Sequence, residues 1–220
     1  MDGKEMRCGK GARMTGAVGM LLGAAAGMGA AALGSVWAAR CADGWEADGH
    51  GPVAAFGIEP ADAARWRRQG AAMAGALGLA AALWNPFTAI GAAVLGWVGA
   101  LDLRYRLIDP AMICAVAACG CLGAPGGPAP ALAVGGACLL GLYALSSVAG
   151  RGRFGLGDAA LIAAMPCLLG PGSMVRFLVV SAVELAVALA WLKMRDADTT
   201  VPLAPLTLVP VAATLIWSLM

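Results

Sequence analysis

The chain has 220 residues, of which 60% are hydrophobic and only 13% charged, and its mean hydropathy is +0.79. A soluble domain averages about 25% charged residues and cannot bury so much apolar surface in one core, so the composition excludes a soluble globular protein and predicts an all-α polytopic membrane protein. The net charge of +2, without a run of basic residues, argues against a nucleic-acid partner.

The first apolar segment runs from Met14 to Ala39, after a polar and basic stretch at residues 1–13. It is about twice as long as the core of a signal peptide, so it is predicted to be the first transmembrane helix. Residues 40–69 form the one long hydrophilic loop, in which Ile58 to Arg65 predicts a short interfacial helix leading into the membrane.

Seven further apolar runs follow between Gly70 and the end of the sequence, so about eight transmembrane helices are predicted. Several runs are shorter than the ~20 residues that an upright helix needs, so their ends are expected to extend into the polar flanks. Asn85-Pro86 predicts a break between two helices, and the Pro/Gly-rich residues 124–130 predict a turn. The predicted spans are residues 70–84, 86–101, 107–123, 130–149, 158–171, 177–192 and 201–219.

The basic residues predict the orientation of these helices. With the N-terminus outside, the inside loops hold ten lysines and arginines and the outside holds five, four of them in the N-terminal tail. Because cytoplasmic loops carry the excess of basic residues, this orientation is favoured, although the basic tail weighs against it. Asp102 and Asp158 then both lie on the cytoplasmic side.

The cysteines favour neither a metal site nor disulfide bonds. No C-x-x-C pair occurs, and His50 stands alone, so we expect no metal and no cofactor. Five of the seven cysteines lie in apolar runs, where they are expected to be reduced and buried. These five are Cys114, Cys119, Cys121, Cys138 and Cys167.

Two aspartates stand at the ends of apolar runs. Asp102 closes one run, and Asp158 begins another within Gly155-Leu-Gly-Asp. Two carboxylates a few ångströms apart cannot both ionise easily, so one can act as a base while the other donates a proton. Gly155 and Gly157 would let a substrate or a helix approach the backbone. From the residues alone, capping of a helix or pairing with an arginine is an equally good interpretation.

Four segments, in order, resemble the prepilin peptidase family of G-x-G-D aspartic membrane proteases. Leu101-Asp-Leu-Arg-Tyr-Arg-Leu-Ile-Asp-Pro110 and Gly155-Leu-Gly-Asp158 resemble its two active-site signatures. Gly34-Ser-Val-Trp-Ala-Ala-Arg40 resembles the end of its first helix, and Val201-Pro-Leu-Ala-Pro-Leu206 resembles the beginning of its last.

This resemblance implies an eight-helix enzyme of the inner membrane that removes the short basic leader from prepilins or pseudopilins at the cytoplasmic face, in type IV pilus assembly or protein secretion. Asp102 and Asp158 match the catalytic pair. The resemblance also implies two regions: residues 1–69 as a short N-terminal helix and cytoplasmic loop, and residues 70–220 as the membrane-embedded peptidase domain.

Three positions depart from the family pattern. Asp109 stands where the family has a proline, and Ala160 stands where it has a lysine. The first loop holds Cys41 alone in place of the two C-x-x-C pairs of long-form members, which removes their zinc site and argues against methyl transfer.

Two other functions stay open. A homologue that binds pilin-like partners without cutting them would keep the same segments. A proton-coupled transporter would also use membrane carboxylates, and Glu184 lies near the middle of a predicted span. We expect Glu184 to be protonated or bonded to a neighbouring helix, and no internal repeat typical of transporters is visible.

Overall fold

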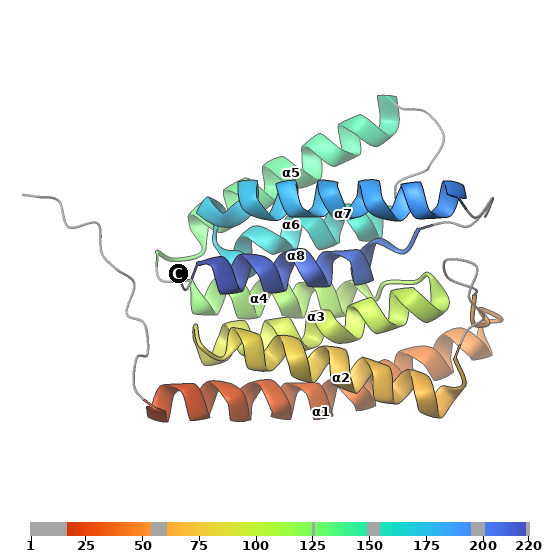
Figure 1. The fold of residues 1–220 in the computed structure, drawn as a ribbon, viewed down its shortest axis with the longest axis horizontal. Helices are drawn as coiled ribbons and strands as arrows, with labels where there is room; N and C mark the ends of the chain where they lie inside the picture. Colours follow the sequence, from red (N-terminus) through yellow and green to blue (C-terminus); the bar gives the residue numbers. More distant parts are fainter. Residues whose placement is uncertain (1–16, 54–60, 125, 149–154, 195–200, 219–220) are drawn as a thin grey trace, which may run out of the picture.

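The computed structural model describes residues 17–53, 61–124, 126–148, 155–194 and 201–218, and these residues form eight α-helices and no strand. The helices run side by side, with α5 tilted away from the rest (Figure 1). A 3₁₀ turn, η1 (Pro171–Ser173), joins two of them. The helices are α1 (Ala17–Ala47), α2 (Ala63–Ala81), α3 (Pro86–Tyr105), α4 (Pro110–Gly123), α5 (Ala129–Val148), α6 (Leu156–Leu169), α7 (Met174–Met194) and α8 (Leu203–Trp217).

The predicted class, an all-α polytopic membrane protein with about eight helices, is confirmed. Three segments are long and apolar enough to cross a membrane: Ala17–Ala47, Pro86–Tyr105 and Pro171–Met194. The shorter α4, α6 and α8 are also apolar, as is most of α5. Asn85 caps α3 by accepting a hydrogen bond from the Thr88 amide at 2.8 Å, so the predicted break at Asn85-Pro86 is confirmed.

The predicted ends of the first two helices are wrong. The first helix continues past Ala39 to Ala47, and the second begins at Ala63 rather than Gly70. The helix α1 continues because its buried side keeps small residues at helical spacing through Ala38 and Ala42. The helix α2 begins early because Asp62 accepts a hydrogen bond from the Arg65 amide at 2.7 Å. The predicted interfacial helix is therefore the first turn of α2 where it is described, and residues 54–60 lie outside the described part.

The centre of the bundle is α3, which is buried along nearly its whole length. Its Trp97 is fully buried and donates a hydrogen bond from Nε1 to the Ala31 carbonyl of α1 at 2.8 Å. A Cβ atom on Gly34 would lie 2.5 Å from the indole ring, and one on Gly70 would lie 2.3 Å from it. Trp97 therefore fits between α1 and α2 only because both helices present glycine there.

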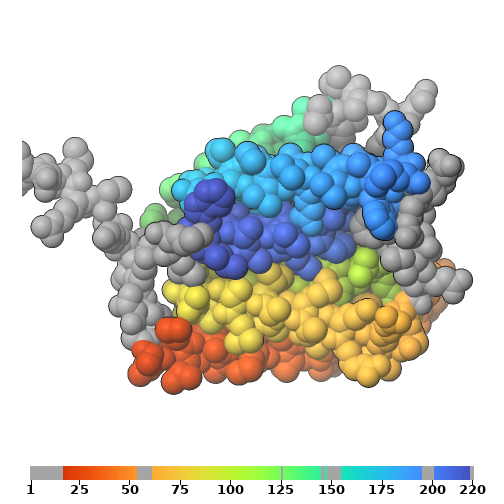
Figure 2. All heavy atoms as spheres, viewed as in Figure 1, coloured from red at the N-terminus to blue at the C-terminus, as the bar shows by residue number. Residues whose placement is uncertain are grey.

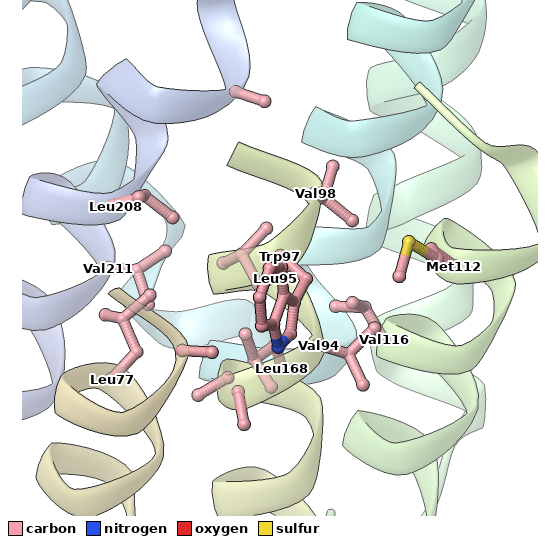
Figure 3. Close-up of a cluster of buried hydrophobic side chains, with 14 of the residues drawn as sticks. Leu77, Val94, Leu95, Trp97, Val98, Met112, Val116, Leu168, Leu208 and Val211 are labelled. Carbon is pink, nitrogen blue, oxygen red and sulfur yellow. The ribbon is translucent and has the colours of Figure 1, made fainter. Parts of the chain in front are cut away.

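The opposite side of α3 packs against α4, α6 and α8. Figure 3 shows the side chains that meet around it, coming from α2, α4, α6 and α8. On the face drawn in Figure 2, α1, α2, α8 and α7 lie in that order across the molecule. The labelled residues of the core are Leu77, Val94, Leu95, Trp97, Val98, Met112, Val116, Leu168, Leu208 and Val211.

Glycine and alanine let the backbones of α1, α2 and α3 approach closely. A Cβ atom on Gly27 would lie 3.0 Å from the backbone of Gly78, and one on Gly96 would lie 2.5 Å from the Cα of Ala74. Helices in lipid associate mainly through such van der Waals contact, since lipid tails are as apolar as the helices themselves.

We predict that Gly96→Ala destabilises the bundle, because backbone atoms of α2 cannot move aside for the added methyl group. Overpacking of this kind costs about 1–3 kcal/mol. The matched control is Gly136→Ala on α5, where a Cβ atom would meet nothing within 4 Å. Thermal unfolding in detergent should show a lower midpoint for the first variant only. Equal midpoints would contradict the close approach of α2 and α3.

Candidate active site

Asp102 lies in the last turn of α3 and is only 5% exposed. Its Oδ2 accepts a hydrogen bond from the amide of Ala204 at 2.9 Å. Ala204 is in the first turn of α8, where amides have no partner within their own helix. Asp102 therefore caps a helix that lies far away in the sequence.

Asp158 lies in the first turn of α6 and is half-buried. Its Oδ2 accepts a hydrogen bond from the Gly155 amide at 3.3 Å, which is the return half of a capping box. A Cβ atom on Gly155 would lie 3.3 Å from the same oxygen. Glycine at this position therefore leaves room for the carboxylate to fold back onto the helix end.

The two aspartates lie at one end of the bundle, where α3 ends and α6 begins. They lie close enough for their charges to interact. Each caps a helix through Oδ2, and no described residue is hydrogen-bonded to the Oδ1 atom of either carboxylate. Capping and catalysis are therefore compatible here, because each carboxylate keeps one oxygen for chemistry.

The connection from α3 to α4 completes this end of the site. Gly157 faces it, since a Cβ atom there would lie 3.4 Å from the Cβ of Ile108. Arg106, the residue after α3, is half-buried, and its charge interacts with that of Asp102. Burial lowers the pKa of Arg106, while the nearby Asp102 carboxylate acts in the opposite direction.

Arg104 has a different role, because it anchors the connection between α1 and α2. Its guanidinium donates hydrogen bonds to the Ala61 carbonyl and, at 3.0 Å, to the Tyr105 hydroxyl, and it lies 3.9 Å from Glu46. It also lies over the ring of Trp66, 5.5 Å from the centroid. The Arg104 carbonyl accepts a further bond from the Val53 amide at 2.7 Å. The hydrophilic loop and the aspartates therefore share one end of the bundle.

Asp109, the first departure from the family pattern, begins α4. Its Oδ1 accepts a hydrogen bond from the Ala111 amide at 2.9 Å, and Pro110 follows as the first helical residue. Its Oδ2 accepts bonds from Trp37 Nε1 at 2.9 Å and from Cys41 Sγ at 3.4 Å. Asp109 thus ties α1 to the beginning of α4.

The other residues singled out in the sequence are Ala160 and Glu184. Ala160, the second departure, packs against the hydrophobic core. On α7, Glu184 has a buried Oε2 atom without a hydrogen-bond partner among the described residues, as has the hydroxyl of Ser181. The buried oxygen of Glu184 therefore lacks the expected bond to a neighbouring helix. Of the two expectations for Glu184, the protonated side chain remains as a prediction.

Two further features lie outside the pair. The described residues contain no group of three or more potential metal ligands. The absence of a metal stays a prediction. A cavity of about 670 Å³ lies at the other end of the bundle, where α3 begins and α4 ends. Its two large polar side chains, Trp84 and Asn85, already donate hydrogen bonds to backbone carbonyls. This cavity is therefore a weaker candidate than the aspartate pair.

The sequence pattern did not point to the Ala204 amide as the partner of Asp102. One signal was present: Pro202 and Pro205 flank Leu203 and Ala204 and leave few amides at that helix end. An amide without an internal partner needs an acceptor. The distant acceptor could be named only once the helices were packed together.

We predict that Asp109→Ala lowers stability, because it removes both the cap of α4 and the acceptor for Trp37. Loss of a cap alone costs about 0.5–2 kcal/mol. Asp109→Asn keeps one acceptor oxygen, so its thermal midpoint should lie between those of the wild type and Asp109→Ala. Its effect on catalysis should be small. An Asp109→Asn protein that is stable but inactive would move Asp109 into the reacting pair.

Comparison with known protein families gives one match. Residues 89–192, just under half of the chain, match the model of the type IV leader peptidase family. Searches of curated proteins and of solved structures return no match. The matched segment contains both Asp102 and Asp158, and it begins in α3 and ends in α7. On this match, residues 89–192 are similar to the type IV leader peptidase family.

Proposed function

We propose that this protein is an aspartic endopeptidase of the inner membrane, which uses Asp102 and Asp158 to remove the leader from prepilins or pseudopilins at the cytoplasmic face. The observation that carries the proposal is that both carboxylates lie at one end of the bundle, near enough for their charges to interact, within the segment that matches the leader peptidase family. The match to this family supports protease activity in general, and the pair supports the aspartic mechanism.

In the proposed reaction, the pair holds one proton and a water molecule between its free oxygens. One carboxylate removes a proton from the water, which attacks the scissile carbonyl of the substrate. The other carboxyl group is kept neutral by its neighbour's charge, polarises that carbonyl, and then protonates the leaving amine. The bonds to the Ala204 and Gly155 amides orient both carboxylates before substrate arrives.

The proposed substrate has a short basic leader, a glycine and then an apolar helix. Its helix would lie in the bilayer beside the bundle, so the leader would reach the aspartates from the cytoplasmic face. We expect no nucleic-acid partner, no cofactor and no methyl transfer to the new N-terminus. The boundary between residues 1–69 and 70–220 remains part of this proposal.

The alternatives receive less support. A non-catalytic homologue would be expected to have lost part of the pair, whereas Asp109 and Ala160 lie in other contacts and leave both carboxylates in place. A transporter would rely on Glu184 to pass protons to neighbouring polar groups. No described residue forms a hydrogen bond with the buried Oε2 atom of Glu184. Neither departure from the family pattern removes a group that the proposed reaction uses.

We predict that Asp102→Asn and Asp158→Asn each reduce leader cleavage by at least about 10²-fold, because an amide can neither accept nor donate the transferred proton. Asparagine also caps helices, so both variants should accumulate normally in the membrane. The assay is co-expression with a prepilin reporter, consisting of a short basic leader, a glycine and an apolar helix, and a gel shift that reports removal of the leader.

The matched control for these variants is Glu184→Gln, which makes the same acid-to-amide change at a carboxyl group away from the pair. It should keep folding and cleavage largely intact. Cleavage by both aspartate variants would end the aspartic-protease proposal. Loss of cleavage in Glu184→Gln at normal membrane levels would favour the proton-relay function instead.

We also predict the orientation in the membrane. Single cysteines placed beside Arg104 and Arg151 should react only with reagents that reach the cytoplasm, whereas one placed in residues 124–130 should react from outside. Arg104 lies at the end of the bundle that holds Asp102, and Arg151 precedes Asp158 by seven positions in the sequence, outside the described residues. Labelling of these two sites from opposite sides would rule out a single site built from both aspartates.

A further inference from the structure

Arg106 has an unusual backbone conformation. Its φ of 57° makes it the one non-glycine residue with positive φ in the described part of the chain. As the C-cap of α3, its amide donates a hydrogen bond to the Asp102 carbonyl at 3.0 Å, and the chain then turns toward α4. Glycine is the ordinary residue for such a left-handed cap, because it has no Cβ atom to clash with the carbonyl.

The strained backbone places the Arg106 side chain close to Asp102. Nε and Nη1 are shielded from solvent, and the charge of the side chain interacts with that of Asp102. Strained backbone conformations persist at functional sites when the side chain contributes to the site. The neighbouring Arg104 has a different place in the structure, because its guanidinium binds Ala61 and lies close to Glu46 and Trp66.

We propose that Arg106 is a positioning residue that supplies the counter-charge of the two-aspartate site, and that a strained left-handed cap is kept at this position for the sake of its cation. This inference rests on the proposed function. Two carboxylates that share one proton carry one negative charge in a poorly solvated place. A fixed cation beside them stabilises that charge throughout the reaction without itself touching the substrate.

The test uses the purified full-length protein in nanodiscs with the prepilin reporter. Arg106→Gly removes the cation and relieves the backbone strain. We expect kcat to fall by about 10²-fold, the loss typical of removing one electrostatic group from an active site, with KM within about twofold of wild type. The thermal midpoint should equal or exceed that of wild type, because glycine suits the left-handed cap.

Two companion variants separate charge from structure. Arg106→Lys keeps both the cation and the strain, so it should restore most of the lost kcat. Arg104→Ala should instead lower the thermal midpoint, because it releases the connection between α1 and α2. Full activity in Arg106→Gly, or equal loss in Arg106→Lys and Arg106→Gly, would overturn the role of Arg106. A lowered midpoint in Arg106→Gly would do the same, since it would mean that the side chain is there for stability.

These outcomes are distinct from a failure of the proposed function. Active Arg106→Gly alongside inactive Asp102→Asn and Asp158→Asn would refute only the role of Arg106. A wild-type protein that leaves the reporter uncut, or aspartate variants that still cut it, would refute the proposed function and this role with it.

Discussion

The bundle depends on the place where Trp97 enters between α1 and α2. The indole is too large for two helices to close over it unless each lacks a side chain at the contact, and Gly34 and Gly70 meet that requirement. Its Nε1 also satisfies a carbonyl of α1, so burial leaves no donor unpaired. With α3 held on this side and packed against α4, α6 and α8 on the other, its last turn has a defined position. Asp102 is in that turn, so packing in the middle of the bundle determines where the carboxylate lies.

In the proposed site, a structural role and a catalytic role are compatible for the same aspartate. Asp102 and Asp158 each satisfy a helix end with one oxygen, and the caps hold the carboxylates in fixed orientations. A group that must react in a defined geometry gains from such support, because orientation is established before the substrate binds. The N-terminus of α8 and Arg106 lie near Asp102, and the N-terminus of α6 is capped by Asp158, so positive charge is close to each carboxylate. Asp109 shows the purely structural counterpart, since all of its described bonds tie together α1 and the start of α4.

Much of this architecture could be predicted from composition, hydropathy and local helix signals. The number of helices followed from the apolar runs, and the start of α3 followed from Asn85-Pro86, which combines a side-chain cap with a first-turn proline. The ends of α1 and α2 could not be predicted in the same way. Hydropathy marks the apolar part of a helix, whereas α1 continues to Ala47 because its small residues still pack against other helices. The Ala204 amide and the left-handed Arg106 depend on packing and backbone geometry, which no local pattern encodes.

The hydrogen bond between Asp102 and Ala204 bears on the order in which the protein can mature. A ribosome delivers Asp102 to the membrane long before α8, because 102 residues separate the two partners. During that interval the carboxyl group lacks the amide that later orients it, and an apolar surrounding makes such a group costly unless water or a proton compensates. Both aspartates of a nascent chain stalled before α8 would already be present, yet one of them would have no fixed direction. Completion of the last described helix is thus the step that converts two membrane carboxyl groups into an ordered pair.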